Sequence, residues 1–388
     1  MKKIFLLTVL ISSSLLFANP PERPAAGGQP QGGQQSGDLV IGGEGIWPRA
    51  NHISQVEDLK AVDLEQVDQF NFELAGQTSV NLSAKKRDNS VKVSFVTRNE
   101  AANANSEIAY FNLARILGVD KLFRAAVPYT LGRNASRTFA ALIERGSFRG
   151  MRAKNATEIA ERLQSNSLKG CLKEKKRGQA VVVNEISSDN APKLRYQLIS
   201  DLQANNPQPS DNNKTSMRGI TKNERGSQVG IDVWAPRATI ARQYSILMTL
   251  DAVFGQWDRY SGSNIGFRLK KDTQNNEVEV YSTDNGGADF WGTKWTLRQA
   301  SWFSRYDKQV ILDLQKIYSF LSGQARSLRS ERLQKTWTDP EEFVVDLGLY
   351  YEASPASYVK NLTKNLGAFL AVVERNVSSA GEARAFFQ

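Results

Sequence analysis

FGQWDRYSGSN, at residues 254–264, and YSTDNGG, at residues 281–287, carry the strongest structural signal in this chain, because each places an aspartate at the end of a regular element. Asp258 follows a long apolar stretch (238–255) that has the composition of a buried helix. Asp284 follows a short apolar strand and precedes an Asn-Gly pair. Two such aspartates are ordinary loop residues in many proteins, but together they are also the two halves of a phosphoryl-transfer site.

The chain before these aspartates alternates like a sheet and then turns helical. FNFEL (70–74) and VKVSFV (91–96) have the period-two pattern of strands. SEIAYFNLARILGV (106–119) repeats its apolar residues at helical spacing, with Ser106 as the expected N-cap and Gly118 as the expected stop. We therefore expect a small strand-rich region that contains one helix.

After residue 119 the sequence predicts further strands and then a mainly helical region from residue 238 onward. A strand is expected within FAALIERGSFRG (139–150), and a buried strand in QAVVVNEI (179–186). The polar stretch 204–230 is predicted to be a mobile loop. A hairpin is expected over 264–282, and amphipathic helices after Trp291. Strands early and helices late predict an α+β fold with the bilobal outline of a protein kinase.

Phosphoryl transfer requires a cation on the phosphates, oxygen ligands for Mg²⁺ or Mn²⁺, and a base that orients the acceptor hydroxyl. Lys92 is predicted to supply the cation, because it lies on the opposite face of its strand from the apolar residues around it. Glu107 begins the following helix, Asp258 lies in a loop, and Asp284 ends a strand. The candidates that compete with Lys92 are Lys85, Lys86 and Arg98.

Three segments together resemble the atypical secretory-pathway kinases of the Golgi casein kinase and four-jointed type. They are EIAYFNLARILGV (107–119), DAVFGQWDRYSGSN (251–264) and YSTDNGG (281–287), in the order and setting of that family. The resemblance implies a bilobal kinase fold, ATP with Mg²⁺ or Mn²⁺ as cofactor, and transfer of the γ-phosphoryl group to a hydroxyl. It makes Glu107 the partner of the phosphate-binding lysine, Asp258 the catalytic base, and Asp284 the metal ligand.

The chain departs from that family pattern at several positions. Tyr260 stands where the family has a histidine, and Ser263 occupies the position, five residues after the base, where many kinase-like loops have an asparagine. Asn264 comes one residue later, so either the loop carries an extra residue and Asn264 is the second metal ligand, or that metal position is altered. No proper glycine-rich phosphate loop is present, and LAGQTSVN (74–81) is the nearest candidate.

The N-terminal residues predict export. Residues 1–18 have two lysines, an apolar run and a small final residue, which is the layout of a secretory signal peptide. Residues 19–45, rich in Pro, Gly and Gln, are predicted to be a flexible linker. Residues 46–388 are predicted to be the kinase-like domain, with an N-lobe at about 68–178 and a C-lobe at about 179–388. The expected location is periplasmic or secreted, with no later transmembrane segment.

Composition narrows the possible chemistry. One cysteine excludes an internal disulfide in the monomer, and one histidine excludes His-based zinc sites and most catalytic schemes that need a histidine. The net charge is +10, and it is +8 when the two lysines of the N-terminal stretch are left out. Because the positive charges are scattered along the chain, the sequence predicts no specific nucleic-acid binding.

Three functions remain open at this stage. The first is an exported kinase that acts on a hydroxyl of a protein, a sugar or a small molecule. The second is a catalytically inactive pseudokinase that binds a nucleotide or a partner. The third is an envelope or host-directed protein whose basic surface binds an anionic polymer, with a vestigial cleft.

Overall fold

The computed structural model describes most of the chain in one compact unit that spans residues 35–388. The described residues are 37–41, 52–76, 78–88, 90–99, 103–164, 168–175, 180–183, 194–212, 214–222, 227–259, 264–270, 276–282, 284–350 and 353–388. Among them, no helix is both long enough and apolar enough to cross a bilayer. The predicted signal peptide lies outside the described residues.

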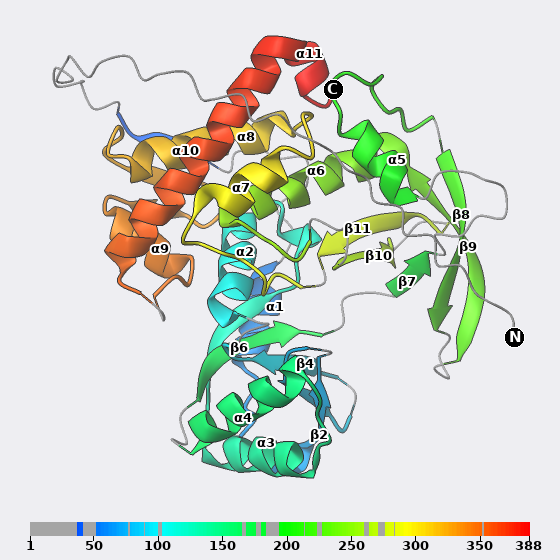
Figure 1. The fold of residues 1–388 in the computed structure, drawn as a ribbon, viewed down its shortest axis with the longest axis vertical. Helices are drawn as coiled ribbons and strands as arrows, with labels where there is room; N and C mark the ends of the chain where they lie inside the picture. The colour runs from blue at the N-terminus through cyan, green and yellow to red at the C-terminus, as the bar shows by residue number, and fades with distance from the viewer. Residues whose placement is uncertain are drawn as a thin grey trace, which may run out of the picture. The chain divides into compact units, whose positions relative to one another are not determined.

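A five-stranded antiparallel sheet forms the first part of the fold (Figure 1). Its strands, in the order in which they pair, are β2 (Phe70–Ala75), β3 (Asn81–Lys86), β4 (Lys92–Val96), β6 (Leu168–Glu174) and β5 (Ala126–Leu131). The strand β6 follows β5 in the sequence but lies between β4 and β5 in the sheet. This insertion places the residues of β6 beside those of β4.

The two faces of this sheet differ in chemistry because successive side chains of a strand point to opposite sides. One face carries an apolar row of cross-strand neighbours, which are Leu82, Phe95 and Leu172. The other face carries a polar row one residue further along, which is Ser83, Ser94 and Lys173. The polar face is the one from which the candidate site is built.

The helix α2 (Ala104–Leu117) packs against β5 and β6 and is almost entirely buried. Asn103 caps its N-terminus, since its side chain accepts hydrogen bonds from the backbone N–H groups of residues 105 and 106. The expected cap at Ser106 is therefore wrong by three residues. Gly118 ends the helix with a φ of 71°, as predicted, because this left-handed conformation favours glycine.

Three further helices belong to this region, and they are α1 (His52–Lys60), α3 (Arg133–Arg145) and α4 (Met151–Leu163). Two short 3₁₀ turns, Val67–Gln69 and Asp120–Leu122, connect elements. The strand expected within residues 139–150 is wrong, because these residues continue α3 and its C-terminal loop. Its buried residues Ala135, Phe139 and Ile143 recur every four residues, which is a helical period that begins before the stretch that was read as a strand.

A second five-stranded sheet lies later in the chain. Its strands pair in the order β11 (Val278–Ser282), β10 (Ile265–Leu269), β7 (Ala180–Val183), β8 (Lys214–Lys222) and β9 (Gln228–Pro236). The predicted hairpin of β10 and β11 and the predicted buried strand β7 are confirmed as strands.

The loop predicted at residues 204–230 is wrong over much of its length. The strands β8 and β9 pair antiparallel over nine residues, from Lys214↔Pro236 to Lys222↔Gln228. The β8 sequence is polar and lacks a clean apolar alternation, which is typical of a loop. The β9 sequence does alternate, with Val229, Ile231 and Val233, but most of it lies beyond residue 230. The pairing with β7 integrates them into the sheet.

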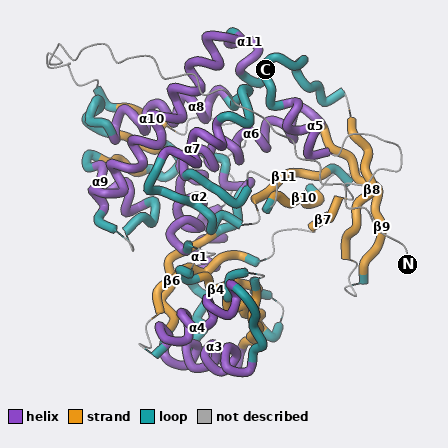
Figure 2. The backbone as a smooth tube through the Cα atoms, viewed as in Figure 1, coloured by secondary structure: helices purple, strands orange, loops and turns teal. Residues whose placement is uncertain are grey.

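Helices dominate from residue 237 onward, as predicted (Figure 2). They are α6 (Arg237–Phe254), α7 (Thr293–Ala300), α8 (Lys308–Leu321), α9 (Pro340–Asp346), α10 (Pro355–Ala380) and α11 (Glu382–Ala385). One further helix, α5 (Leu194–Asp201), precedes β8 and β9. Fourteen residues of α6 are buried, and α7 and α10 pack beside it. This buried helix delivers the chain to the loop that carries Asp258.

A small third sheet pairs β1 (Leu39–Ile41) with β12 (Leu328–Ser330), which also pairs with β13 (Lys335–Trp337). Ile41 is fully buried. Folded structure therefore begins within the predicted linker of residues 19–45, before the predicted domain boundary at residue 46. The strand LVI was not predicted from the sequence, because it has only three residues and follows a Gly-rich stretch.

The chain has the α+β fold that the sequence predicts, with a strand-rich first part and a mainly helical later part. The element order also agrees with the predicted kinase-like arrangement, since a sheet and a buried helix precede a second buried helix, a loop and a hairpin. The second sheet adds more strand to the later part than the sequence indicated.

Candidate active site

A buried ion pair between Lys173 and Glu107 forms the centre of the site. Lys173 extends from the polar face of β6, and Glu107 lies in the first turn of α2. Their Nζ and Oε1 atoms are in direct contact, and the two residues are 7% and 1% exposed. The docking of α2 against β6 brings these two charges together.

The charges of this pair depend on one another. Burial raises the pKa of Glu107, and the nearby Asp284 raises it further, while the positive charge of Lys173 opposes both effects. Burial alone would lower the pKa of Lys173, but the negative charges of Glu107 and Asp284 outweigh it and raise that pKa. Lys173 is therefore held as a cation.

The lysine that meets Glu107 is thus Lys173 and not Lys92, so the sequence-based choice of lysine is wrong. Lys92 does lie on the polar face of the sheet, as predicted, and is directly opposite Lys85 on β3. It is β6, however, that carries the lysine in contact with Glu107. The position of β6 between β4 and β5 is a result of tertiary folding that the sequence of VKVSFV does not contain.

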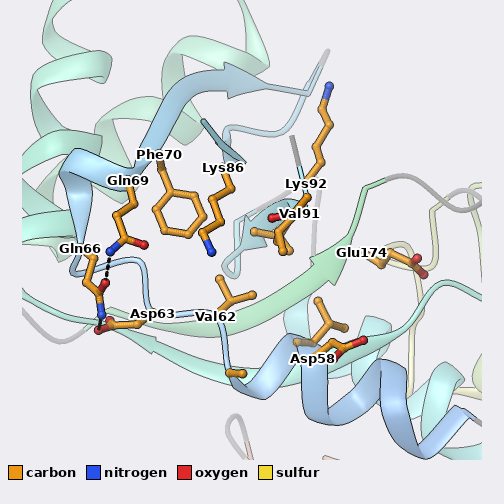
Figure 3. A pocket seen from close by; sticks show the side chains of 14 residues that line it. Asp58, Val62, Asp63, Gln66, Gln69, Phe70, Lys86, Val91, Lys92 and Glu174 are labelled. Atoms are coloured by element: carbon orange, nitrogen blue, oxygen red, sulfur yellow. Dashed lines mark hydrogen bonds between the residues drawn. The ribbon is translucent and has the colours of Figure 1, made fainter. Parts of the chain in front are cut away.

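A pocket borders the opposite face of this sheet, and Lys92 is among the residues that line it (Figure 3). It has a volume of about 520 Å³, and its walls include Asp58, Phe70, Lys86 and Glu174. Glu174 follows Lys173 on β6 and therefore points to the other side of the sheet. In Figure 3 the side chain of Lys92 points away from that of Lys86. This pocket is distinct from the site around Lys173.

Asn285 joins the end of the β11 segment to the N-terminus of α2. Its backbone N–H donates to Oε1 of Glu107 at 3.3 Å, and its side-chain amide donates to Oε2 at 3.2 Å. The hydroxyl of Ser106 donates to the carbonyl of Asn285 at 2.5 Å, and the N–H of Asn103 donates to the carbonyl of Gly286 at 3.1 Å. These bonds fix the DNGG segment against the helix that bears Glu107.

Asp284 lies just after β11 and beside the ion pair. Its Oδ1 atom is 3.8 Å from Nζ of Lys173 and accepts a hydrogen bond from the N–H of Gly286 at 3.1 Å. Burial would raise the pKa of Asp284, but Lys173 and the hydrogen bonds to the carboxylate lower it. The Asp284 side chain is 50% exposed. It is therefore an ionised carboxylate that remains accessible to a ligand.

Asp258 lies in the loop after α6, which ends at Gly255 with a φ of 65°. Its backbone N–H donates to Oε1 of Gln256 at 3.1 Å, and its Oδ2 accepts a hydrogen bond from the side-chain amide of Asn264 at 2.7 Å. Asn264 has a φ of 61°, in the left-handed region that asparagine tolerates better than most residues. The two residues predicted from this loop are thus in direct contact.

The Asp258 loop and the DNGG segment lie against each other. The N–H of Trp257 donates to the carbonyl of Gly287 at 3.0 Å. A Cβ atom at Gly287 would approach the Cβ of Asp258 to 2.9 Å, so only glycine fits there without a shift. The structure therefore brings Asp258 and Asp284 into adjoining segments, as the sequence predicted.

Arg259 contacts both of these segments through its side chain. It is fully buried, and its Nε atom is 2.9 Å from Oδ2 of Asp251 on α6. Its guanidinium also donates to the carbonyl of Asn264 at 2.7 Å, to the carbonyl of Asp284 at 3.0 Å and to Oδ1 of Asn285 at 2.7 Å. One side chain thus contacts both loops and the helix that precedes them.

Sequence reasoning missed Lys173, Asn285 and the position-holding role of Arg259. The signal that could have identified Lys173 is the apolar pair before it, Cys171-Leu172, which is typical of a strand. Asn285 was noted beside Asp284 but was given no role. Tyr260 and Ser263, which carry the departures from the family pattern, lie outside the described residues.

The described residues contain no group of three or more His, Cys, Asp or Glu side chains arranged to hold a metal ion. Mg²⁺ is commonly bound by one or two carboxylates together with substrate phosphates, and not by an all-protein cage. Asp284, ionised and half exposed beside Lys173, fits the first of these modes. The side-chain oxygen atoms of Asp284 and Asn264 are of the type that could hold a metal arriving with a phosphorylated ligand.

Comparison with known proteins found likenesses among solved structures. No protein-family model matches the chain, and no curated protein matches it. Among solved structures, the chain is similar to one titled "Crystal structure of the golgi casein kinase", with 11% sequence identity and a TM-score of 0.43. The match covers 86% of this chain and 78% of the other. With a TM-score below 0.5, this likeness adds nothing about individual residues, whose roles rest on the contacts described above.

Proposed function

We propose that this chain is a kinase-like phosphotransferase, which binds ATP with Mg²⁺ or Mn²⁺ and transfers the γ-phosphoryl group to a hydroxyl. The observation that carries the proposal is the contact of Lys173 with Glu107, with Asp284 at 3.8 Å from the same ammonium group. A cation paired with a helix glutamate, next to a carboxylate that can hold a metal, is the arrangement that phosphoryl transfer requires.

Each residue of the site has a role in this proposal. Lys173 binds the phosphates, and Glu107 positions Lys173 through their ion pair. Asp284 holds the metal, which neutralises charge on the phosphates when it is bound. Asn264 donates its side-chain N–H to Asp258, which leaves the side-chain oxygen Oδ1 of Asn264 as a second metal ligand.

Asp258 is proposed to be the base that orients the acceptor hydroxyl. Its Oδ2 accepts from Asn264, and its backbone is held by Gln256. The carboxylate therefore has a fixed orientation before any acceptor binds. Geometry of this kind is what a base needs, since it must lie within hydrogen-bond reach of the proton that it removes.

A pseudokinase is the second candidate function. The departures at Tyr260 and Ser263 and the lack of a glycine-rich phosphate loop favour it. In that case the Lys173–Glu107 pair and Asp284 would bind a nucleotide without turnover. We also propose that the protein is exported to a periplasm or secreted, as its first 18 residues suggest, and that its acceptor is a protein, a glycan or a small molecule met in that compartment.

Transfer of a labelled γ-phosphoryl group, read on the chain itself and on added hydroxyl acceptors, tests the proposal. We expect metal-dependent transfer by the wild type. Asp258→Asn should keep nucleotide affinity within a few-fold while transfer falls roughly 10²- to 10⁴-fold, the usual scale for a lost general base. Asp284→Asn should lose metal-dependent nucleotide binding as well as transfer.

Two outcomes would count against this assignment. Nucleotide binding by the wild type without transfer above the Asp258→Asn background would establish the pseudokinase. Absence of any metal-dependent nucleotide binding would reject both candidates.

A further inference from the structure

The helix α7 and its two flanks expose an unusual set of side chains. Trp291, Leu297 and Trp302 are 47%, 45% and 37% exposed, and Lys294 and Arg298 are exposed between them. Thr296, Gln299 and Ala300 are buried on the other side of the helix. We call the exposed set, Trp291, Lys294, Leu297, Arg298 and Trp302, the α7 face.

Helical spacing places three residues of the α7 face, Lys294, Leu297 and Arg298, on one side of the helix. Residues 294, 297 and 298 are three and four positions apart and are therefore neighbours on a helix surface. Trp291 and Trp302 lie just outside the helix, before its N-cap Gly292 and after its C-cap Ser301, and the ring of Trp291 packs against that of Tyr358 with a centroid distance of 5.2 Å. The exposed tryptophans flank a short stripe of two cations and a leucine.

The charge of this segment is one-sided. From residue 290 to residue 306 the sequence contains Lys294, Arg298 and Arg305 but no aspartate or glutamate. The two cations of the α7 face lie 5.3 and 5.0 Å from the ring centroid of Trp295, which supports their positions. Single exposed apolar residues are common on soluble proteins, but a group of exposed tryptophans and a leucine beside cations is typical of an interaction site.

We propose that the α7 face is a docking surface for an anionic membrane. Tryptophan is enriched where protein meets the lipid headgroups, because its ring is apolar and its N–H is polar. Amphipathic helices that lie in the bilayer interface combine Trp and Leu with Lys and Arg, as this face does. Each Lys or Arg near an anionic bilayer adds attraction. Lys294 and Arg298 supply this attraction against one flanking acid, Asp289, whose carboxylate accepts a hydrogen bond from the N–H of Trp291 at 3.1 Å.

This binding would be peripheral, since no helix among the described residues is suited to crossing a bilayer. It does not depend on the proposed phosphotransferase activity, because none of the five residues contacts Lys173, Glu107, Asp258 or Asp284 through a bond described above. The two proposals therefore succeed or fail separately.

Vesicle sedimentation tests the proposal with a chain of residues 19–388, which lacks the apolar N-terminal stretch that could itself enter a bilayer. The probes are vesicles of phosphatidylcholine alone and vesicles of phosphatidylcholine and phosphatidylglycerol in equal parts. We expect binding to the anionic vesicles, weak binding to the neutral ones, and loss of binding in high salt.

Two variants of the α7 face are compared with matched controls. Lys294→Glu with Arg298→Glu should lower the affinity for anionic vesicles about tenfold or more, since two attractions become repulsions. The control, Arg133→Glu with Arg137→Glu on α3, changes the net charge equally at two exposed residues and should have a small effect. Trp291→Ala with Trp302→Ala should also lower affinity, whereas Met151→Ala, at an exposed apolar residue of α4, should not.

A melting curve for each variant separates loss of binding from loss of folding. Failure of the wild type to bind anionic vesicles would overturn the proposal, as would equal losses in the control variants. If the wild type ignores vesicles but self-associates, and Trp291→Ala with Trp302→Ala abolishes that association, the face is an interface with a second copy and the membrane proposal is wrong.

Discussion

Lys173 and Glu107 form a pair from which water is largely excluded, and this determines how substitutions should act at the scale of single residues. Taking a charge out of water costs several kcal/mol unless a partner of opposite charge offsets it. Removing one member leaves the other buried and unpaired. Removing both leaves no unpaired charge from this ion pair but also no phosphate-binding cation. The effect on stability and the effect on function can therefore be measured separately.

The first prediction concerns Lys173→Met. We expect it to lower the free energy of unfolding by about 3 kcal/mol, because Glu107 is then buried without its partner. We also expect it to abolish nucleotide binding, because the cation proposed to bind the phosphates is removed. The loss of stability should shrink at low pH. Burial already raises the pKa of Glu107 in the wild type, and protonation of Glu107 in the folded variant favours the folded state as the pH falls.

Adding Glu107→Gln to Lys173→Met should recover much of the lost stability but none of the nucleotide binding. Lys92→Met is the matched control, since it removes a lysine from the same sheet face, and it should leave both properties nearly unchanged. Urea unfolding and calorimetric titration with ATP and Mg²⁺ measure the two properties. If Lys92→Met abolishes binding and Lys173→Met does not, the assignment of the lysine is wrong.

The sequence predicted the acids of the site better than its cation, for a physical reason. Glu107, Asp258 and Asp284 each occupy a position relative to a helix or strand that can be read locally. Several lysines share the polar face of the first sheet, among them Lys85, Lys92, Lys173 and Lys175. Which of them meets Glu107 depends on the order of strands in the sheet, and no local pattern encodes that order.

At the scale of elements, the site depends on three segments that meet at Arg259. The end of α6 supplies Asp251, the next loop supplies the carbonyl of Asn264, and the end of β11 is followed by Asp284 and Asn285. Tyr110 on α2 also donates to Asp251 at 2.9 Å. The loops therefore take their positions from two buried helices and a strand.

The second prediction is that Arg259→Met destabilises the protein by about 3–5 kcal/mol, because Asp251 remains buried without its cation. Urea unfolding measures this. Arg87→Met, at an exposed arginine next to β3, should change stability by less than about 0.5 kcal/mol. An Arg259→Met variant as stable as the wild type would show that Arg259 does not hold the segments together.

Elements were predictable where their apolar residues follow one period. The helix α2 and the hairpin of β10 and β11 meet this condition and are confirmed. The helix α6 was predictable from its long apolar composition and is also confirmed. The strand β8 meets neither condition, because its sequence is polar and its place between β7 and β9 comes from a sheet assembled across distant segments. The helix α3 was misread because only its second half is apolar.

At the scale of the whole molecule, folded structure begins at β1, well before the first sheet. Asp38 accepts a hydrogen bond from Ser327 at 2.8 Å, and Leu39 donates its N–H to the carbonyl of Ser327 at 3.2 Å. Ile41 is fully buried.

The third prediction follows from this boundary. Removing residues 1–36 should leave the melting temperature nearly unchanged, whereas removing residues 1–41 should lower it, because β12 then loses its parallel partner and a buried isoleucine. Thermal unfolding of the two truncated chains checks this. Equal melting temperatures would mean that β1 adds nothing to stability.

The central claim is that Lys173, Glu107, Asp284 and Asp258 form one nucleotide site, and a crystal structure with a non-hydrolysable ATP analogue and Mn²⁺ tests it most directly. We expect an anomalous Mn²⁺ peak at coordination distance from a carboxylate oxygen of Asp284, with phosphate oxygens in contact with Nζ of Lys173. The terminal phosphate should face Asp258. Nucleotide bound elsewhere, for example in the pocket lined by Phe70 and Lys86 on the other sheet face, would contradict the claim.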